Sequence, residues 1–250
     1  MDFDLPALVE PEMCARCKER FRPKDLLERQ CFDCRGSGKS TAGLERIRSN
    51  RAEDIPSFLA GVGVPARFQR WRTRAEWCER FDSAWPVQLS TDPWLGRPEM
   101  VYVHGPTGTG KTGLGTLLLL ERGLAGLGCR WIAAADVLAG LQQEFNEPGP
   151  RSLSQSLRAV TVLVIDGLWD GKGVAGDRPS EWQLEALSGL LDARWRDMRE
   201  TIVTSNWTPL QIGALAPALA SRLVDPDGGE LVQLGGADRR IMARRQRRAE

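Results

Sequence analysis

Eight consecutive residues have the spacing G-x-x-x-x-G-K-[ST], which is typical of a phosphate-binding loop. They are Gly105, Pro106, Thr107, Gly108, Thr109, Gly110, Lys111 and Thr112. Glycines let the backbone curl so that several N–H groups point at one anion, the lysine reaches the β- and γ-phosphates, and the last hydroxyl faces a Mg²⁺ ion. The segment therefore predicts a site for a nucleoside triphosphate and magnesium.

A phosphate loop needs a strand before it and a helix after it, and the sequence supplies both. Residues 100–104 are typical of a short apolar strand, and leucines recur with helical spacing over residues 112–127. The N-terminus of a helix adds its dipole to an anion site. We therefore expect Gly113 to lie in the first helical turn, beside the bound phosphates.

Two later apolar segments also end in polar side chains. Asp166 ends the segment 161–166, and Asn206 follows the segment 201–204. Because ligands bind outside the carboxyl ends of parallel strands, we expect Asp166 and Thr112 to support the magnesium ion and Asn206 to hold the attacking water. From residue 98 onward apolar strands alternate with helices, which predicts an α/β fold, a parallel sheet flanked by helices.

Four of the six cysteines form two C-x-x-C pairs, Cys14 with Cys17 and Cys31 with Cys34, thirteen residues apart. Each pair can place two thiolates on one tight turn, and two such pairs complete a tetrahedral zinc site. Disulfides are not expected in a cytosolic chain, and no βαβ pattern surrounds either pair, as a redox motif would require. We expect a small zinc-binding module that meets either DNA or an acidic protein face.

Composition favours a globular protein, with 250 residues, 42% apolar and 27% charged side chains and a net charge of +1. No apolar run reaches the roughly 20 residues of a membrane helix, and the first residues lack the features of a signal peptide. We therefore expect a cytoplasmic protein with no membrane partner. We divide it into a zinc module at 1–40, a helical linker region at 41–95 and a nucleotide-binding domain at 96–250.

Arginine recurs in two further segments. Residues 56–95 mix arginines with aromatic side chains, which either pack on the main domain or stack on nucleobases. Six arginines crowd the last dozen residues, and this basic tail either contacts nucleic acid phosphates or is a solvated chain end.

The motifs GPTGTGKT, VLVIDG, LLDARW, TIVTSN, ASRL and GADRR follow one another along the chain. In this order they resemble the helicase-loader branch of the AAA+ ATPases, which includes the DnaC and DnaI loaders and the IstB transposition ATPases. The resemblance runs from about Gly61 to Arg240. It implies that the nucleotide is ATP and that residues 96–250 form an AAA+ ATPase domain.

The same resemblance assigns roles to single residues. Asn206 matches the sensor-1 polar residue, and Arg222 matches the arginine finger that reaches a neighbouring subunit's nucleotide. Arg240 matches a late arginine near the phosphates, and Arg194 with Trp195 matches an Arg–aromatic pair. The cysteine-rich module resembles the zinc domain by which DnaI-type loaders grip the replicative helicase.

One position departs from the family pattern. The family usually follows the strand-ending aspartate with a second acid, which polarises the attacking water, whereas this chain has Gly167. A glycine cannot act as a base, and Asp170 is the nearest candidate to replace it. We expect ATP to bind well and to be hydrolysed slowly or only with a partner.

The function that the sequence favours is ATP-dependent loading of the replicative helicase onto single-stranded DNA, by subunits that self-associate into a spiral or ring. Two alternatives stay open. One is an IstB-like transposition ATPase, and the other is a zinc-dependent adaptor in which ATP is a switch and little hydrolysis occurs.

Overall fold

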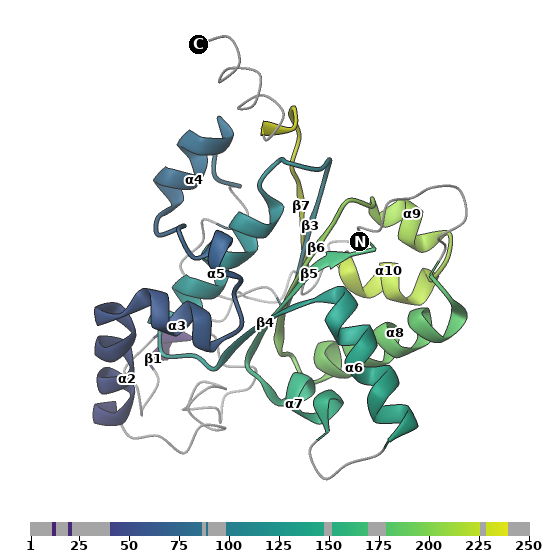
Figure 1. Cartoon of the computed structure of the whole chain (residues 1–250), viewed down its shortest axis with the longest axis horizontal. Coiled ribbons are helices and arrows are strands. Elements are labelled where there is room, and N and C mark those ends of the chain that lie inside the picture. The colour runs from purple at the N-terminus through teal and green to yellow at the C-terminus, as the bar shows by residue number, and fades with distance from the viewer. Residues whose placement is uncertain are drawn as a thin grey trace, which may run out of the picture.

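The structure is a computed structural model, and it describes residues 12–13, 20–21, 41–86, 89, 99–147, 152–169, 179–225 and 229–239. Its central element is a five-stranded sheet in the order β4-β5-β6-β3-β7 (Figure 1). The strands are β3 (Met100–His104), β4 (Cys129–Ala133), β5 (Val162–Leu168), β6 (Glu200–Ser205) and β7 (Gly229–Gln233). Every pairing is parallel, so the predicted parallel α/β sheet is confirmed.

Helices cover both faces of this sheet (Figure 1). One face carries α2 (Thr41–Glu53), α3 (Ile55–Gly61), α4 (Arg74–Phe81) and α5 (Lys111–Leu124). The other carries α6 (Ala134–Asn146), α7 (Leu153–Ala159), α8 (Glu181–Arg196), α9 (Pro209–Gly213) and α10 (Pro217–Leu223). None of the helices in the described ranges has the length and hydropathy of a membrane span.

Strands β3 and β5 are largely apolar because both of their faces are buried. Successive residues of a strand point to opposite faces, so Val101 and Val103 join the core under α5, whereas Met100 and Tyr102 join the core under α8 and α10. Strands of parallel sheets have this near-continuous apolar character. Because the strands are parallel, their carboxyl ends lie at one edge of the sheet, where the loops that carry the polar residues begin.

The linker region shares its core with the sheet. The side chains of Leu59, Val64, Trp71 and Trp77 are buried in the same cluster as the leucines of α5. Packing on the main domain, one of the two interpretations of these aromatic residues, therefore accounts for Trp71 and Trp77. A short 3₁₀ helix, Ala66–Phe68, joins α3 to the segment before α4.

Two arginines of α2 bind the C-terminal end of α5. Arg48 Nε donates to the carbonyl oxygen of Ala125 at 3.0 Å, and Arg51 Nη1 donates to those of Gly123 and Leu127, both at 2.7 Å. The last carbonyl groups of a helix lack intrahelical partners and carry partial negative charge, which cations stabilise. Helix α2 is therefore fixed to the helix that begins at the phosphate loop.

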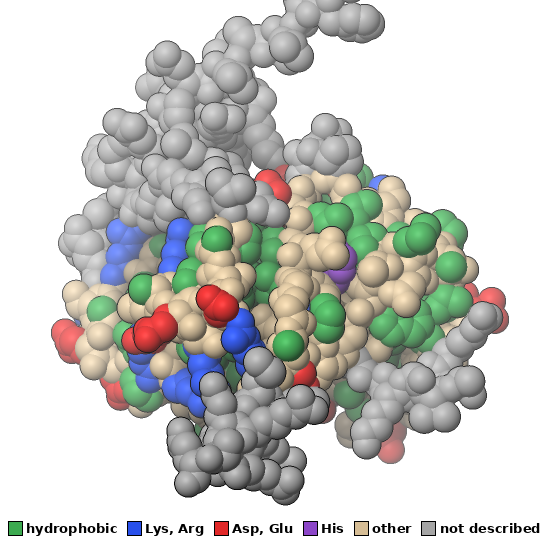
Figure 2. Space-filling view, turned by 90° about the horizontal axis from the view of Figure 1, so that it is seen from above, with side chains coloured by type: hydrophobic (Ala, Val, Ile, Leu, Met, Phe, Trp, Pro, Cys, Tyr) green, Lys and Arg blue, Asp and Glu red, His purple; other side chains and the backbone are tan. Residues whose placement is uncertain are grey.

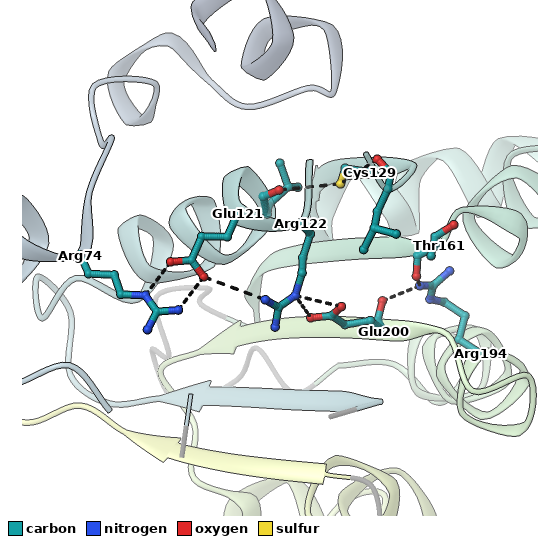
Figure 3. A network of polar contacts seen from close by, with 9 residues as sticks. Arg74, Glu121, Arg122, Cys129, Thr161, Arg194 and Glu200 are labelled. Atoms are coloured by element: carbon teal, nitrogen blue, oxygen red, sulfur yellow. Dashed lines mark hydrogen bonds and ion pairs between the residues drawn. The ribbon is translucent and has the colours of Figure 1, made fainter. Parts of the chain in front are cut away.

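A network of charged side chains crosses the layers from α4 to α8 (Figure 3). Arg74 on α4 pairs with Glu121 on α5 at 2.6 Å, and the next residue of α5, Arg122, pairs with Glu200 on β6 at 2.9 Å. Both members of the second pair are buried. Arg194 on α8 then donates to the backbone oxygen of Glu200 at 2.7 Å. The network ties α5 to the strand that leads to Asn206.

Two short strands, β1 (Glu12–Met13) and β2 (Arg20–Phe21), pair antiparallel in the N-terminal region. They precede and follow the Cys14–Cys17 pair in sequence. The four cysteines predicted to bind zinc lie outside the described residues.

Candidate nucleotide-binding site

The predicted phosphate loop lies between β3 and α5, as its motif requires. Gly108 and Gly110 adopt positive φ angles of 83° and 99°, which glycine reaches without steric cost. A side chain at position 108 would collide with the carboxylate of Asp238, and one at position 110 would come within 2.8 Å of the Phe81 ring. The backbone thus forms a cradle that only glycine permits at these positions.

Lys111 lies in the cradle with its ammonium group almost wholly buried. Its Nζ atom donates to the carbonyl oxygens of Gly105 and Pro106, each at 2.8 Å, and to Oδ1 of Asn206 at 2.7 Å. Strand β6 lies between β3 and β5 in the sheet. This order brings Asn206 to the loop although it is far away in sequence.

Asp166 lies beside Thr112, as expected for two groups that share a magnesium ion. Its carboxylate accepts hydrogen bonds from the Thr112 side chain and, at 2.7 Å, from Thr204 Oγ1. Burial raises the pKa of Asp166, while these hydrogen bonds and the charge of Lys111 act in the opposite direction. A carboxylate next to a hydroxyl is the oxygen ligand set that Mg²⁺ prefers, so the residues present fit the ion.

Thr204 is a positioning residue that the sequence did not single out. Its hydroxyl donates to Asp166 and accepts the backbone N–H of Gly167 at 2.9 Å. Thr204 lies on β6, two residues before Asn206 in the sequence. Strand β6 pairs with β5, and the sequence alone does not show which residue of β6 lies beside Asp166.

The backbone geometry explains why position 167 is glycine. Gly167 has a φ angle of 73°, and the pairing of β5 with β6 shifts register between Ile165 and Leu168. Bulges with a left-handed residue favour glycine because other residues are strained there. The described structure thus has a bulge where the resembling family carries an acid, and Asp170 lies outside the described residues.

A cavity of about 680 Å³, including its open mouth, adjoins the phosphate loop. The loop and Asn206 line it together with residues of the linker region. The latter are Arg67, Phe68, Arg70, Trp71, Arg80 and Phe81. Helix α4 is held to the loop because Trp77 Nε1 donates to the carbonyl oxygen of Gly110 at 3.0 Å.

The segment after β7 completes the rim of this cavity. Arg239 lines it, and its Nη2 atom donates to the carbonyl oxygen of Phe81 at 3.0 Å and to Asp82 Oδ2 at 3.3 Å. The resemblance assigned the late arginine to Arg240, which lies outside the described residues. Its neighbour Arg239 was not predicted, because the contact joins positions 157 residues apart.

Arg222 lies away from the phosphate loop of its own chain and does not line the cavity. Its Nε atom lies 3.2 Å from Asp192 Oδ1, and its guanidinium group covers the Trp195 ring at 4.0 Å. The side chain is 36% exposed. Arg194 does not share this surface, since it is fully buried. The predicted pair of Arg194 and Trp195 thus points in two directions, one inward and one toward Arg222.

The remaining candidate groups do not form a second site. His104 is buried beside Tyr102, and burial and the charge of Lys111 lower the pKa of its imidazole. Among the described ranges there is no cluster of three metal-ligating side chains. This finding does not test the zinc ligands predicted from sequence, because they lie outside those ranges.

No protein-family model and no curated protein matches the chain. Several solved structures are similar to it. DnaA from Aquifex aeolicus bound to AMPPCP has 18% identity and a TM-score of 0.48, over 61% of this chain and 46% of DnaA. The DnaC helicase loader has 25% identity and a TM-score of 0.41, over 54% and 77%. DnaI has 18% identity and a TM-score of 0.42, over 66% and 81%.

The match spans less than half of the DnaA chain. The glycine cradle, Lys111 and the parallel sheet that aligns them with Asp166 are features of this chain itself. In fold, the chain is a parallel α/β domain with a glycine-rich loop of the phosphate-binding pattern between β3 and α5.

Proposed function

We propose that the protein is an ATP-dependent loader that places the replicative helicase on single-stranded DNA. The observation that supports this best is the meeting of Lys111, Asn206, Thr112 and Asp166 at the carboxyl ends of three neighbouring strands. Loop amides and Lys111 would bind the phosphates, and Thr112 and Asp166 would hold magnesium. When bound, the ion supplies positive charge that offsets the charge of the phosphates.

The function is tested by co-purification with a replicative helicase. Immobilised full-length protein should retain the helicase when ATP and magnesium are present and lose most of it without nucleotide. A Cys31→Ser variant, measured with its zinc content, tests whether the proposed zinc module binds the helicase. Retention of a transposase in place of the helicase would favour the IstB-like alternative. Calorimetry showing no heat with ATP and magnesium would refute the nucleotide site itself.

Arg222 is proposed to act on the nucleotide of a neighbouring copy. Its distance from its own cavity and its partial exposure support a role across an interface. An Arg222→Ala change should reduce ATP-dependent assembly and hydrolysis by about 100-fold or more, because such arginines stabilise transition-state charge. ATP affinity should change less than about threefold. Light scattering and titration calorimetry measure the two effects. A large loss of ATP affinity in the monomer would rule out the finger role.

Hydrolysis by the protein alone is proposed to be slow, because Gly167 provides no base. We expect turnover well below about 1 s⁻¹ without partners and a marked rise when helicase and single-stranded DNA are added. Rapid turnover that Asp170→Ala abolishes would show that Asp170 supplies the missing base. Rapid turnover that survives this change would refute the assignment of the site.

The bulge at Gly167 also favours a second candidate function, a zinc-dependent adaptor in which ATP binding is a switch. In that case hydrolysis should stay absent with helicase and DNA present. The same turnover assay therefore separates the adaptor from the loader.

A further inference from the structure

The cavity beside the phosphate loop has an unusual charge. Among the described residues, its lining contains five cationic side chains and no acid, and the five are Arg67, Arg70, Arg80, Lys111 and Arg239. The chain as a whole carries a net charge of only +1. Like charges gathered in one pocket repel each other and attract anions.

Two of the five cations have partners that account for their positions. Lys111 is bound by the loop carbonyl groups and Asn206, and Arg239 pairs with Asp82. Arg67, Arg70 and Arg80 differ. Within the described parts of the chain, none of the three forms an ion pair with a carboxylate, and all three are exposed.

Aromatic rings support two of these arginines. The guanidinium carbon of Arg67 lies 5.3 Å from the Phe68 ring centroid, and that of Arg70 lies 4.9 Å from the Trp71 centroid. A guanidinium group over a ring keeps its N–H groups available at the edge. Figure 2 shows that basic side chains gather on the half of this face that carries the α2–α4 layer.

The three arginines belong to the linker region, and they line the same cavity as the phosphate loop. The loop amides, Lys111 and magnesium are sufficient to bind the 5′-phosphate chain of a nucleotide, so these arginines are available for another group of the ligand. Arginine forks match the geometry of phosphate oxygens. The ligand that these arginines suit is therefore a phosphate group away from the 5′ chain.

The adjoining groove argues against a nucleic acid strand as its source. It is lined by Arg70, Trp71, Glu76, Glu79 and Arg80, and its two glutamates would repel a continuous line of phosphates. A single compact phosphate group meets the arginines without running past these acids.

We propose that Arg67, Arg70 and Arg80 form a second phosphate subsite, which takes a phosphate group carried on the ribose of the bound nucleotide. The inference rests on the proposed nucleotide function and adds a class of ligand to it. Nucleotides phosphorylated at the 2′ or 3′ position would then bind more tightly than their parent compounds.

Titration calorimetry of the full-length protein tests this with three probes: ADP, and ADP bearing an additional phosphate at the 2′ or the 3′ position. At least one phosphorylated probe should bind about 10-fold more tightly than ADP. Combined replacement of Arg67, Arg70 and Arg80 by alanine should remove this gain, so that the variant binds all three probes with similar affinity. The three side chains are exposed, so the variant should fold.

Arg46→Ala provides the control, because Arg46 is an exposed arginine on α2 and should leave the gain unchanged. Equal affinity for all three probes would overturn the subsite and leave the proposed function standing. Absence of ADP binding would overturn both. If an oligothymidine, rather than the phosphorylated probes, loses affinity in the triple variant, the arginines bind a nucleic acid backbone and the proposal is wrong.

Discussion

Replacing Arg194 with methionine is expected to lower the free energy of unfolding by about 3–5 kcal/mol. The guanidinium group donates to the backbone oxygens of Leu157, Val160 and Glu200 at 2.6–2.7 Å and to Thr201 Oγ1 at 2.8 Å. These acceptors belong to α7, β6 and the segments beside them. Methionine fills much of the space but leaves buried acceptors without donors, which is costly. Urea unfolding at pH 7 measures the change.

The same experiment has a matched control on the same helix. Arg196 is 66% exposed and pairs only with Asp192 across one helical turn, so Arg196→Met should change stability by less than about 0.5 kcal/mol. Burial lowers the pKa of Arg194 to about 9, so the group is still charged at pH 7. A loss below about 1 kcal/mol in Arg194→Met would contradict the supporting role of this residue.

Replacing Lys111 with alanine is expected to weaken ATP binding by about 100-fold or more, because a buried ammonium beside the phosphates forms strong charge-assisted hydrogen bonds. Lys111 is only 6% exposed, and it is the one lysine among the described residues that line the cavity. Titration calorimetry with ATP and magnesium measures the loss.

Lys111→Ala also removes hydrogen bonds within the protein, so thermal unfolding must accompany the titration. A variant that melts cooperatively and has lost ATP binding supports the assignment. A folded variant that binds ATP within about threefold of the original would show that the nucleotide lies elsewhere.

The sequence predicted the sheet and its phosphate loop well because these depend on local patterns. Residues 100–104 were predicted as a strand and form β3, and most of the apolar segment 161–166 lies in β5. Asp166 and Asn206 were also found locally, since each follows an apolar strand. The strand order that brings them to Lys111 could not be derived from local spacing, because it depends on pairing between distant segments.

The missed residues all act through contacts between distant positions. The sequence does not distinguish Thr204 from other threonines, because its role depends on its hydrogen bond to Asp166. The motif GADRR contains both Arg239 and Arg240, and the resemblance assigned the role to Arg240. In the structure, Arg239 lines the cavity. Trp71 and Phe81 were seen as packing or stacking residues. Their place on the wall of the nucleotide cavity depends on how α4 lies against the loop, through Trp77 and Gly110.

The left-handed backbone at Gly167 limits how the rate of ATP consumption can change over evolutionary time. Introducing glutamate there would strain the chain at a φ of 73° and disturb the hydroxyl link to Thr204, so a single codon change would add an acid while misplacing it. A variant that carried out the proposed ATP hydrolysis rapidly without a partner would first have to lose the bulge at this position. A partner protein that supplies an acid would require fewer changes in this chain.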